Sequence, residues 1–71
     1  MKTTLTVHAP NTLVTIAGGK EARIGSALIN EYGVSYRVGY WRDDVWTEVY
    51  LPADEVTASE DAQTWRVRFH A

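Results

Sequence analysis

The sequence predicts a small all-β protein, a single antiparallel barrel of five to six strands with one 3-10 turn. Polar and apolar residues alternate along most of the chain, which is the period of a half-buried strand. Short clusters of turn-forming residues interrupt this alternation. No segment keeps a 3.6-residue period long enough for an α-helix. Because 71 residues leave room for only one domain, we expect residues 1–71 to form one barrel, whose closure would remove exposed strand edges.

The first two strands are predicted at residues 4–8 and 13–16. The first alternates strictly, and the second is a short run rich in β-branched residues. Residues 9–12 lie between them and carry turn chemistry, because Pro10 fixes φ and Asn11 tolerates unusual backbone angles. We therefore expect residues 3–17 to form an N-terminal hairpin, which Gly18 and Gly19 bring to an end.

The third and fourth strands are predicted at residues 23–30 and 34–41. Gly25 and Ser26 interrupt the third strand, which indicates a bulge or sharp bend of the kind that small barrels need at a corner. Gly33 is suited to a left-handed position in the connecting turn.

The register of this hairpin has two solutions. A two-residue turn at residues 32–33 directs Ala27 and Ile29 to the core, whereas a three-residue turn at residues 31–33 directs Leu28 there. A slip of one residue reverses every side chain. Both sets of residues are apolar, so the pattern leaves the choice open, and one of Leu28 and Ile29 is expected outside.

The C-terminal third is predicted to contain two more strands. The fifth covers residues 46–51 and ends at Pro52, which cannot donate a ladder hydrogen bond. Residues 53–56 are too short for an α-helix and predict a 3-10 turn. A polar connector follows at residues 57–63. The sixth strand, at residues 64–69, alternates an apolar face of Trp65, Val67 and Phe69 with a polar face of Thr64, Arg66 and Arg68.

A tight turn at Asp43 and Asp44 fixes the register of the central hairpin. It places Trp41 opposite Trp46, Gly39 opposite Glu48 and Arg37 opposite Tyr50 on one sheet face. The other face, which is richer in aliphatic side chains, is expected to point to the core. The residues assigned to that core face are Tyr36, Val38, Tyr40, Thr47, Val49 and Leu51. The wider candidate core consists of Leu5, Val7, Val14, Ile16, Ile24, Val38, Val49, Leu51, Val67 and Phe69.

The outward face is the best candidate for a binding site, and it contains Trp41, Trp46, Tyr50 and Arg37. These residue types are enriched at the energetic hot spots of protein interfaces. Facing tryptophans stack across strands, and Gly39 leaves room beside them. The alternative is that one of the terminal segments covers this face and completes the core.

The remaining composition argues against catalysis and against bound metal or cofactor. Cysteine is absent, which excludes disulfides and thiolate chemistry. His8 and His70 could meet if the terminal strands pair, but two histidines without a third ligand do not make a zinc site. Asp43 and Asp44 are typical turn residues, and no nucleophile has a base and an orienting acid in a known motif. We expect no enzyme activity, no cofactor, no metal and no small-molecule substrate.

Residues 19–57 resemble the small SH3-like barrels of phage and prophage accessory proteins. The resemblance rests on residues 22–29 as a bent strand, on residues 34–41 with their Tyr-x-Val-x-Tyr-Trp pattern, and on residues 50–56, where the last strand runs into a 3-10 turn. The N-terminal hairpin and the C-terminal strand depart from the simple pattern and leave the strand order open. The resemblance implies a binding or assembly role rather than chemistry.

The function expected from these observations is a non-enzymatic module that binds a protein partner or self-associates. The second possibility is a nucleic-acid-binding barrel, in which Trp41 and Trp46 would stack on bases beside a basic stripe. That stripe would contain Arg23, Arg37, Arg42, Arg66 and Arg68. A net charge of -2, from seven basic and nine acidic residues, weakens this second option. A third possibility, an inhibitor or subunit acting on a host enzyme, is not separated from the first by the sequence. No membrane-spanning or signal segment is expected, and the predicted compartment is the cytoplasm, that of a bacterial host if the resemblance holds.

Overall fold

The computed structural model describes residues 2–59 and 62–70, and its described secondary structure consists of strands and two 3-10 turns. The strands are β1 (Lys2–His8), β2 (Leu13–Ile16), β3 (Lys20–Asn30), β4 (Gly33–Arg42), β5 (Val45–Pro52), β6 (Thr57–Ala58) and β7 (Thr64–His70). The 3-10 turns are η1 (Ala17–Gly19) and η2 (Ala53–Glu55). The all-β prediction is confirmed. The structure adds two elements that were not expected. The polar connector contributes the two-residue strand β6, and the residues around the two consecutive glycines form η1.

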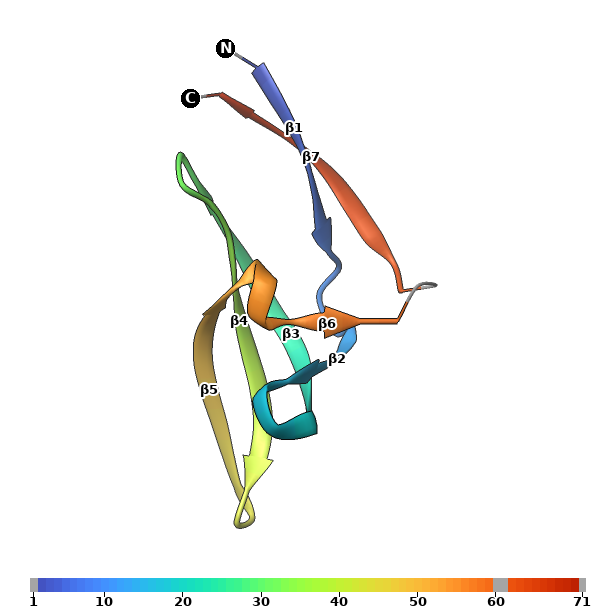
Figure 1. The fold of residues 1–71 in the computed structure, drawn as a ribbon, viewed down its shortest axis with the longest axis vertical. Coiled ribbons are helices and arrows are strands. Elements are labelled where there is room, and N and C mark those ends of the chain that lie inside the picture. The colour runs from blue at the N-terminus through green and yellow to red at the C-terminus, as the bar shows by residue number, and fades with distance from the viewer. Residues whose placement is uncertain (1, 60–61, 71) are drawn as a thin grey trace.

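Every strand pair in the described part of the chain is antiparallel, and the strands form two sheets (Figure 1). The larger sheet has the order β5-β4-β3-β2-β6, and β1 pairs with β7 in a two-stranded ribbon. The predicted N-terminal hairpin is therefore wrong, since β2 pairs with β3 and β6 whereas β1 pairs with β7. The turn around Pro10 carries the chain from the ribbon into the larger sheet. Residues 2–59 and 62–70 contain no helix that is long and apolar enough to cross a membrane.

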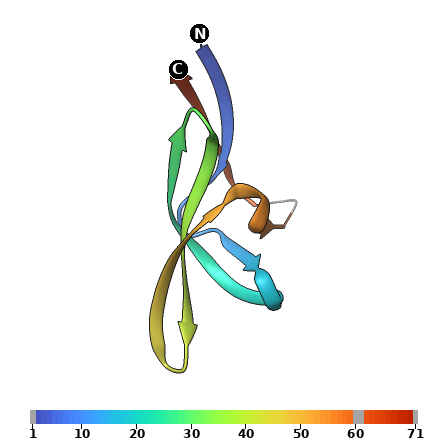
Figure 2. The same cartoon turned by 60° about the vertical axis from the view of Figure 1, so that its left-hand side comes forward.

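The larger sheet curls because its two edge strands are consecutive in the chain. In a flat sheet, four strand spacings of about 4.8 Å would separate β5 from β6 by about 19 Å. Only Ala53–Glu55 and Val56 link them, and a 3-10 turn rises about 2 Å per residue. The link is too short for a flat sheet, so the edges must approach each other, with η2 between them (Figure 2). The described strands stop short of a closed barrel, since no ladder joins β5 to β6.

A β-bulge bends β3 where the sequence predicts it. Ile24 pairs with Val38 and Ser26 pairs with Arg37, so Gly25 is the extra residue. Beyond the bulge, Asn30 pairs with Gly33, which makes residues 31–32 the turn.

This register decides the question that the sequence left open in the β3–β4 hairpin. Ala27 and Ile29 pack against the core, whereas Leu28 is 49% exposed. The turn lies one residue earlier than the two-residue option, residues 32–33, and is one residue shorter than the three-residue option, residues 31–33. The face assignment is nevertheless that of the two-residue option.

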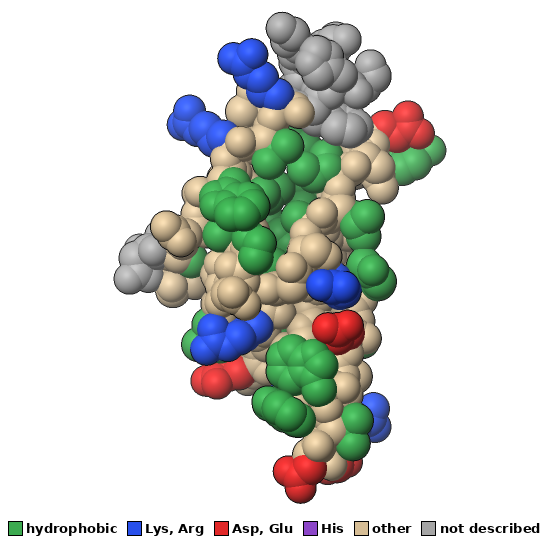
Figure 3. Space-filling model, turned by 180° about the vertical axis from the view of Figure 1, so that it is seen from behind, with side chains coloured by type: hydrophobic (Ala, Val, Ile, Leu, Met, Phe, Trp, Pro, Cys, Tyr) green, Lys and Arg blue, Asp and Glu red, His purple; other side chains and the backbone are tan. Residues whose placement is uncertain are grey.

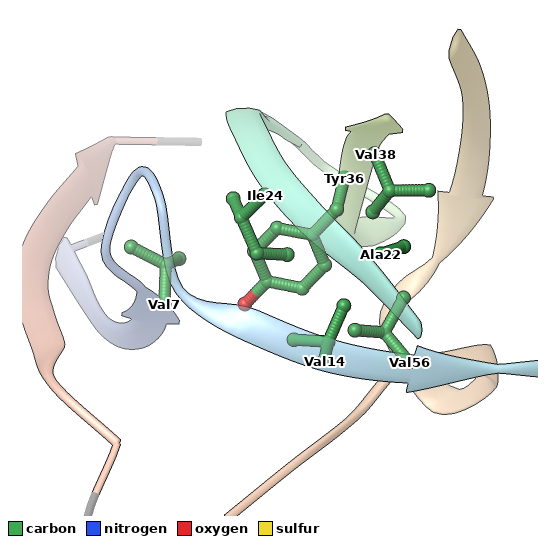
Figure 4. Packing of buried hydrophobic residues seen from close by; sticks show 7 residues of the cluster. All are labelled: Val7, Val14, Ala22, Ile24, Tyr36, Val38 and Val56. Carbon is green, nitrogen blue, oxygen red and sulfur yellow. The ribbon is translucent and has the colours of Figure 1, made fainter. Parts of the chain in front are cut away.

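The core lies between the curled sheet and the C-terminal end of β1 in the ribbon (Figure 4). Tyr36 sits at its centre, and its hydroxyl accepts a hydrogen bond of 2.9 Å from the backbone N–H of His8. The His8 ring stacks on the Tyr36 ring at 5.4 Å. Tyr36 therefore ties the ribbon to the sheet. The buried cluster consists of Val7, Val14, Ala22, Ile24, Tyr36, Val38 and Val56.

The rest of the predicted core is arranged around this cluster. Leu5, Ile16, Val49, Leu51 and Val67 are half-buried. Phe69 lies outside the residues whose side chains are described. Trp65, which the alternation places on the same strand face as Val67, is 54% exposed. The Trp65 side chain stays exposed because β7 pairs only with β1, and this two-stranded ribbon is too narrow to cover a large ring.

Candidate functional site

The register of the β4–β5 hairpin is the one predicted from its turn. Trp41 pairs with Trp46, Gly39 with Glu48 and Arg37 with Tyr50. Asp43 and Asp44 occupy the turn with φ values of 49° and 65°. Two positive φ values are what a tight two-residue hairpin requires, because this backbone twist matches that of the flanking strands. The turn residues therefore determine which side chains of the hairpin point away from the core.

The face that carries the four predicted site residues points away from the core. Trp41 is 68% exposed, Tyr50 62% and Trp46 45%, and Arg37 is half-buried. On the opposite face of β4, Val38 is 0% exposed. We call Trp41, Trp46, Tyr50 and Arg37 together the aromatic face.

Within the described residues, neither terminal strand covers the aromatic face, so the alternative considered from the sequence is wrong there. The termini lie side by side at one end of the elongated molecule, which measures 45 × 23 × 17 Å, and the tip of the β4–β5 hairpin lies at the other (Figure 1). The terminal segments pair with each other in the β1–β7 ribbon. The aromatic face is consequently open in the single chain.

The two tryptophans form an ordered pair. Their ring centroids are 5.3 Å apart in an edge-to-face arrangement, a geometry that aromatic quadrupoles favour. Nε1 of Trp46 donates a hydrogen bond of 3.3 Å to Oε2 of Glu48. The Trp46 ring lies directly over Gly39, where an added Cβ would come within 2.1 Å of Cζ2. Gly39 is therefore required for this ring position.

Arg37 lies across the bulge in β3. A Cβ on Gly25 would be 3.0 Å from its Nε and 3.1 Å from Nη2, so the missing side chain at the bulge makes room for the guanidinium. Nε is buried, and no described group accepts a hydrogen bond from it. The bulge and Gly25 thus hold a cation beside Tyr50, its cross-strand neighbour.

A shallow hollow of about 400 Å³ opens beside the tryptophan pair. Trp41 and Trp46 form one side of it, and residues of β2 and β3 form the other. In the lower half of the view in Figure 3, hydrophobic side chains lie next to acidic and basic ones. The lining residues are Leu13, Lys20, Glu21, Ala22, Arg23, Gly39, Tyr40, Trp41 and Trp46. Local sequence patterns do not indicate that residues of β2 and β3 line this hollow, because their position beside the tryptophans depends on the pairing of β2 with β3.

The predicted basic stripe is only partly formed. Arg66 and Arg68 belong to β7, in the ribbon, whereas Arg37 belongs to the larger sheet. Arg42 pairs with Val45 and therefore alternates to the face opposite Trp41. Arg23 pairs with Gly39 and so shares the outward face with Arg37, and it donates a hydrogen bond to the backbone oxygen of Asn11. The described cations are thus spread over different faces and sheets.

The two histidines do not meet, although the terminal strands do pair. His8 is opposite Thr64, and His70 is opposite Lys2. Because the pairing is antiparallel, residues near the two chain ends fall at opposite ends of the ladder. The described residues contain no group of three potential metal ligands.

No protein-family model, curated protein or solved structure matches this chain. Its function must therefore be inferred from the side chains and their geometry.

Proposed function

We propose that this chain is a non-enzymatic protein-binding or assembly module and that the aromatic face is its binding surface. The observation that carries the proposal is the exposure of Trp41, Trp46 and Tyr50 on one face of a 71-residue domain. Large exposed aromatic side chains that share one face are typical of interaction sites in soluble proteins. Trp, Tyr and Arg are also the residues most enriched at interface hot spots.

The tryptophan pair is pre-organised, which favours tight binding. Gly39 and Glu48 hold Trp46 in place, and Trp41 packs edge-to-face against it. Ordering a rotamer-rich side chain on binding costs about 0.5–1.5 kcal/mol. Side chains already ordered in the free protein avoid much of that cost.

The hollow beside the pair is suited to one anchoring side chain of a partner. Its wall is aromatic and its far side carries the apolar Leu13 with the charged Lys20, Glu21 and Arg23. Pockets with an apolar lining and a few polar groups favour an apolar group with a polar tip. A partner's aromatic or long aliphatic side chain fits that description.

The charges around the face favour a protein over a nucleic acid. Glu21 and Glu48 lie among the cations, and Arg66 and Arg68 are located in the other sheet. Phosphate backbones are bound by clustered Lys and Arg. A phage or prophage accessory role, a host enzyme as the partner and a cytoplasmic location stay predictions from the sequence.

Site-specific photocrosslinking in the native cells tests the proposed function. A benzophenone amino acid replaces Tyr50 in one variant and Tyr32 in another. Tyr32 is 90% exposed in the turn between β3 and β4, so it is a matched aromatic control outside the aromatic face. We expect a discrete protein adduct from position 50 and none from position 32.

Two results would count against this function. Equal adducts from both positions would indicate non-specific contact. An adduct from position 50 that nuclease removes would favour the nucleic-acid alternative. The mass of a protein adduct also reports whether the partner is a second copy of the chain or another protein.

A further inference from the structure

Two opposite charges on the aromatic side of the hairpin lack an ion-pair partner within the described part of the chain. Arg37 and Glu48 lie on adjacent strands in neighbouring rows of the same face, since Arg37 pairs with Tyr50 and Glu48 with Gly39. No ion pair joins them in the described structure. Arg37 instead lies over Gly25 with its Nε unsatisfied, and Glu48 accepts the hydrogen bond from Trp46. Each charge is thus held in place by a neighbour and has no ion-pair partner in the described structure.

We propose that the partner of the aromatic face is a second copy of this chain, related by a two-fold axis. This inference rests on the proposed function and specifies its partner. An axis that lies in the plane of the interface, and that crosses the line from Arg37 to Glu48 at its midpoint and at right angles, places Arg37 of each copy opposite Glu48 of the other. Two reciprocal ion pairs result, as in any isologous interface, where the contact of one residue with another is repeated by symmetry.

The surrounding side chains fit this arrangement. A single axis would cover Trp41, Trp46 and Tyr50 of both chains, which are exposed in the single chain. The attraction within each ion pair would be less screened in the interface than at a wet surface, and pairing offsets part of the cost of desolvating the two charges. The fixed position of Arg37 over the bulge lowers the entropy lost when its planar fork meets a carboxylate. The face therefore complements itself in charge, and the second copy covers its aromatic side chains.

Charge exchange between two full-length variants tests the inference. Arg37→Glu places glutamates opposite each other in its own dimer, and Glu48→Arg places arginines opposite each other. Like charges in an interface oppose association. We expect wild type to sediment as a dimer at high concentration, and each variant alone to show a dimer dissociation constant at least roughly 100-fold weaker.

An equimolar mixture of the two variants is expected to dimerise again. In the mixed dimer, the glutamate introduced at position 37 of the first variant faces the arginine introduced at position 48 of the second. The unchanged Glu48 of the first variant faces the unchanged Arg37 of the second, so both ion pairs are restored. Recovery of the dimer also shows that both variants are folded, and circular dichroism of each variant provides a second check. A Tyr32→Ser variant serves as the control and should dimerise like wild type.

Two outcomes would overturn the second copy as partner. One is a wild type that stays monomeric at its highest soluble concentration. The other is a pair of folded variants that dimerise as tightly as wild type. A monomeric wild type together with a heterologous adduct from position 50 would leave the proposed protein-binding function standing. No adduct from position 50 would refute that function separately.

Discussion

Replacement of Val38 by alanine is expected to lower the free energy of unfolding by about 2 to 3 kcal/mol, because it removes two buried methyl groups and leaves a cavity. Val38 is 0% exposed and belongs to the cluster around Tyr36. A domain of this size has a total stability of only roughly 4–10 kcal/mol. The melting temperature should fall by roughly 10–20 °C.

Val45→Ala is the matched control for this prediction. It makes the same chemical change on the paired strand, but Val45 is 62% exposed beside the turn. Its melting temperature should stay close to that of wild type. Equal losses in the two variants, measured by thermal unfolding, would show that Val38 is no more buried in solution than Val45 and would contradict its position in the core.

Gly39→Ala is expected to break the tryptophan pair without removing either indole. The new Cβ would overlap the Trp46 ring, which must leave its position over the strand. The exciton signal of two adjacent indoles in far-ultraviolet circular dichroism should therefore disappear. Binding through the aromatic face should weaken by roughly 30-fold or more, the effect of losing a hot-spot residue.

Gly25→Ala is the control for the circular dichroism measurement. It adds the same methyl group within the same sheet, but the nearest atoms to the new Cβ all belong to Arg37, its Nε at 3.0 Å, Nη2 at 3.1 Å and backbone oxygen at 3.3 Å, and none belongs to Trp46. The exciton signal should persist in this variant. A persistent signal in Gly39→Ala would show that the Trp46 ring does not lie over Gly39 in solution.

The sequence predicts the central hairpin well because its information is local. Asp43 and Asp44 define the turn, and the alternation on either side then determines the face of each residue through a period of two. The same local logic locates the bulge at Gly25. It fails to choose between Leu28 and Ile29, because both are apolar and only the exact position of the turn separates them.

The partner of the first strand could not be predicted from local patterns. Residues 4–8 alternate in a way that suits pairing with either β2 or β7, and nothing in the turn near Pro10 distinguishes a hairpin from a crossing between sheets. Its pairing with β7 closes a loop that spans nearly the whole chain. For the same reason, the hollow beside the tryptophans and the exposure of Trp65 emerge only from the three-dimensional structure.

Acrylamide quenching of tryptophan fluorescence tests most directly whether the aromatic face is open in the single chain and covered on association. The experiment uses the Trp65→Phe variant, so that only Trp41 and Trp46 report. We predict strong quenching in dilute monomer, which falls as concentration rises and the face becomes covered. Complete protection of both tryptophans in a protein proven monomeric by sedimentation would contradict the account, because it would place the pair in the core.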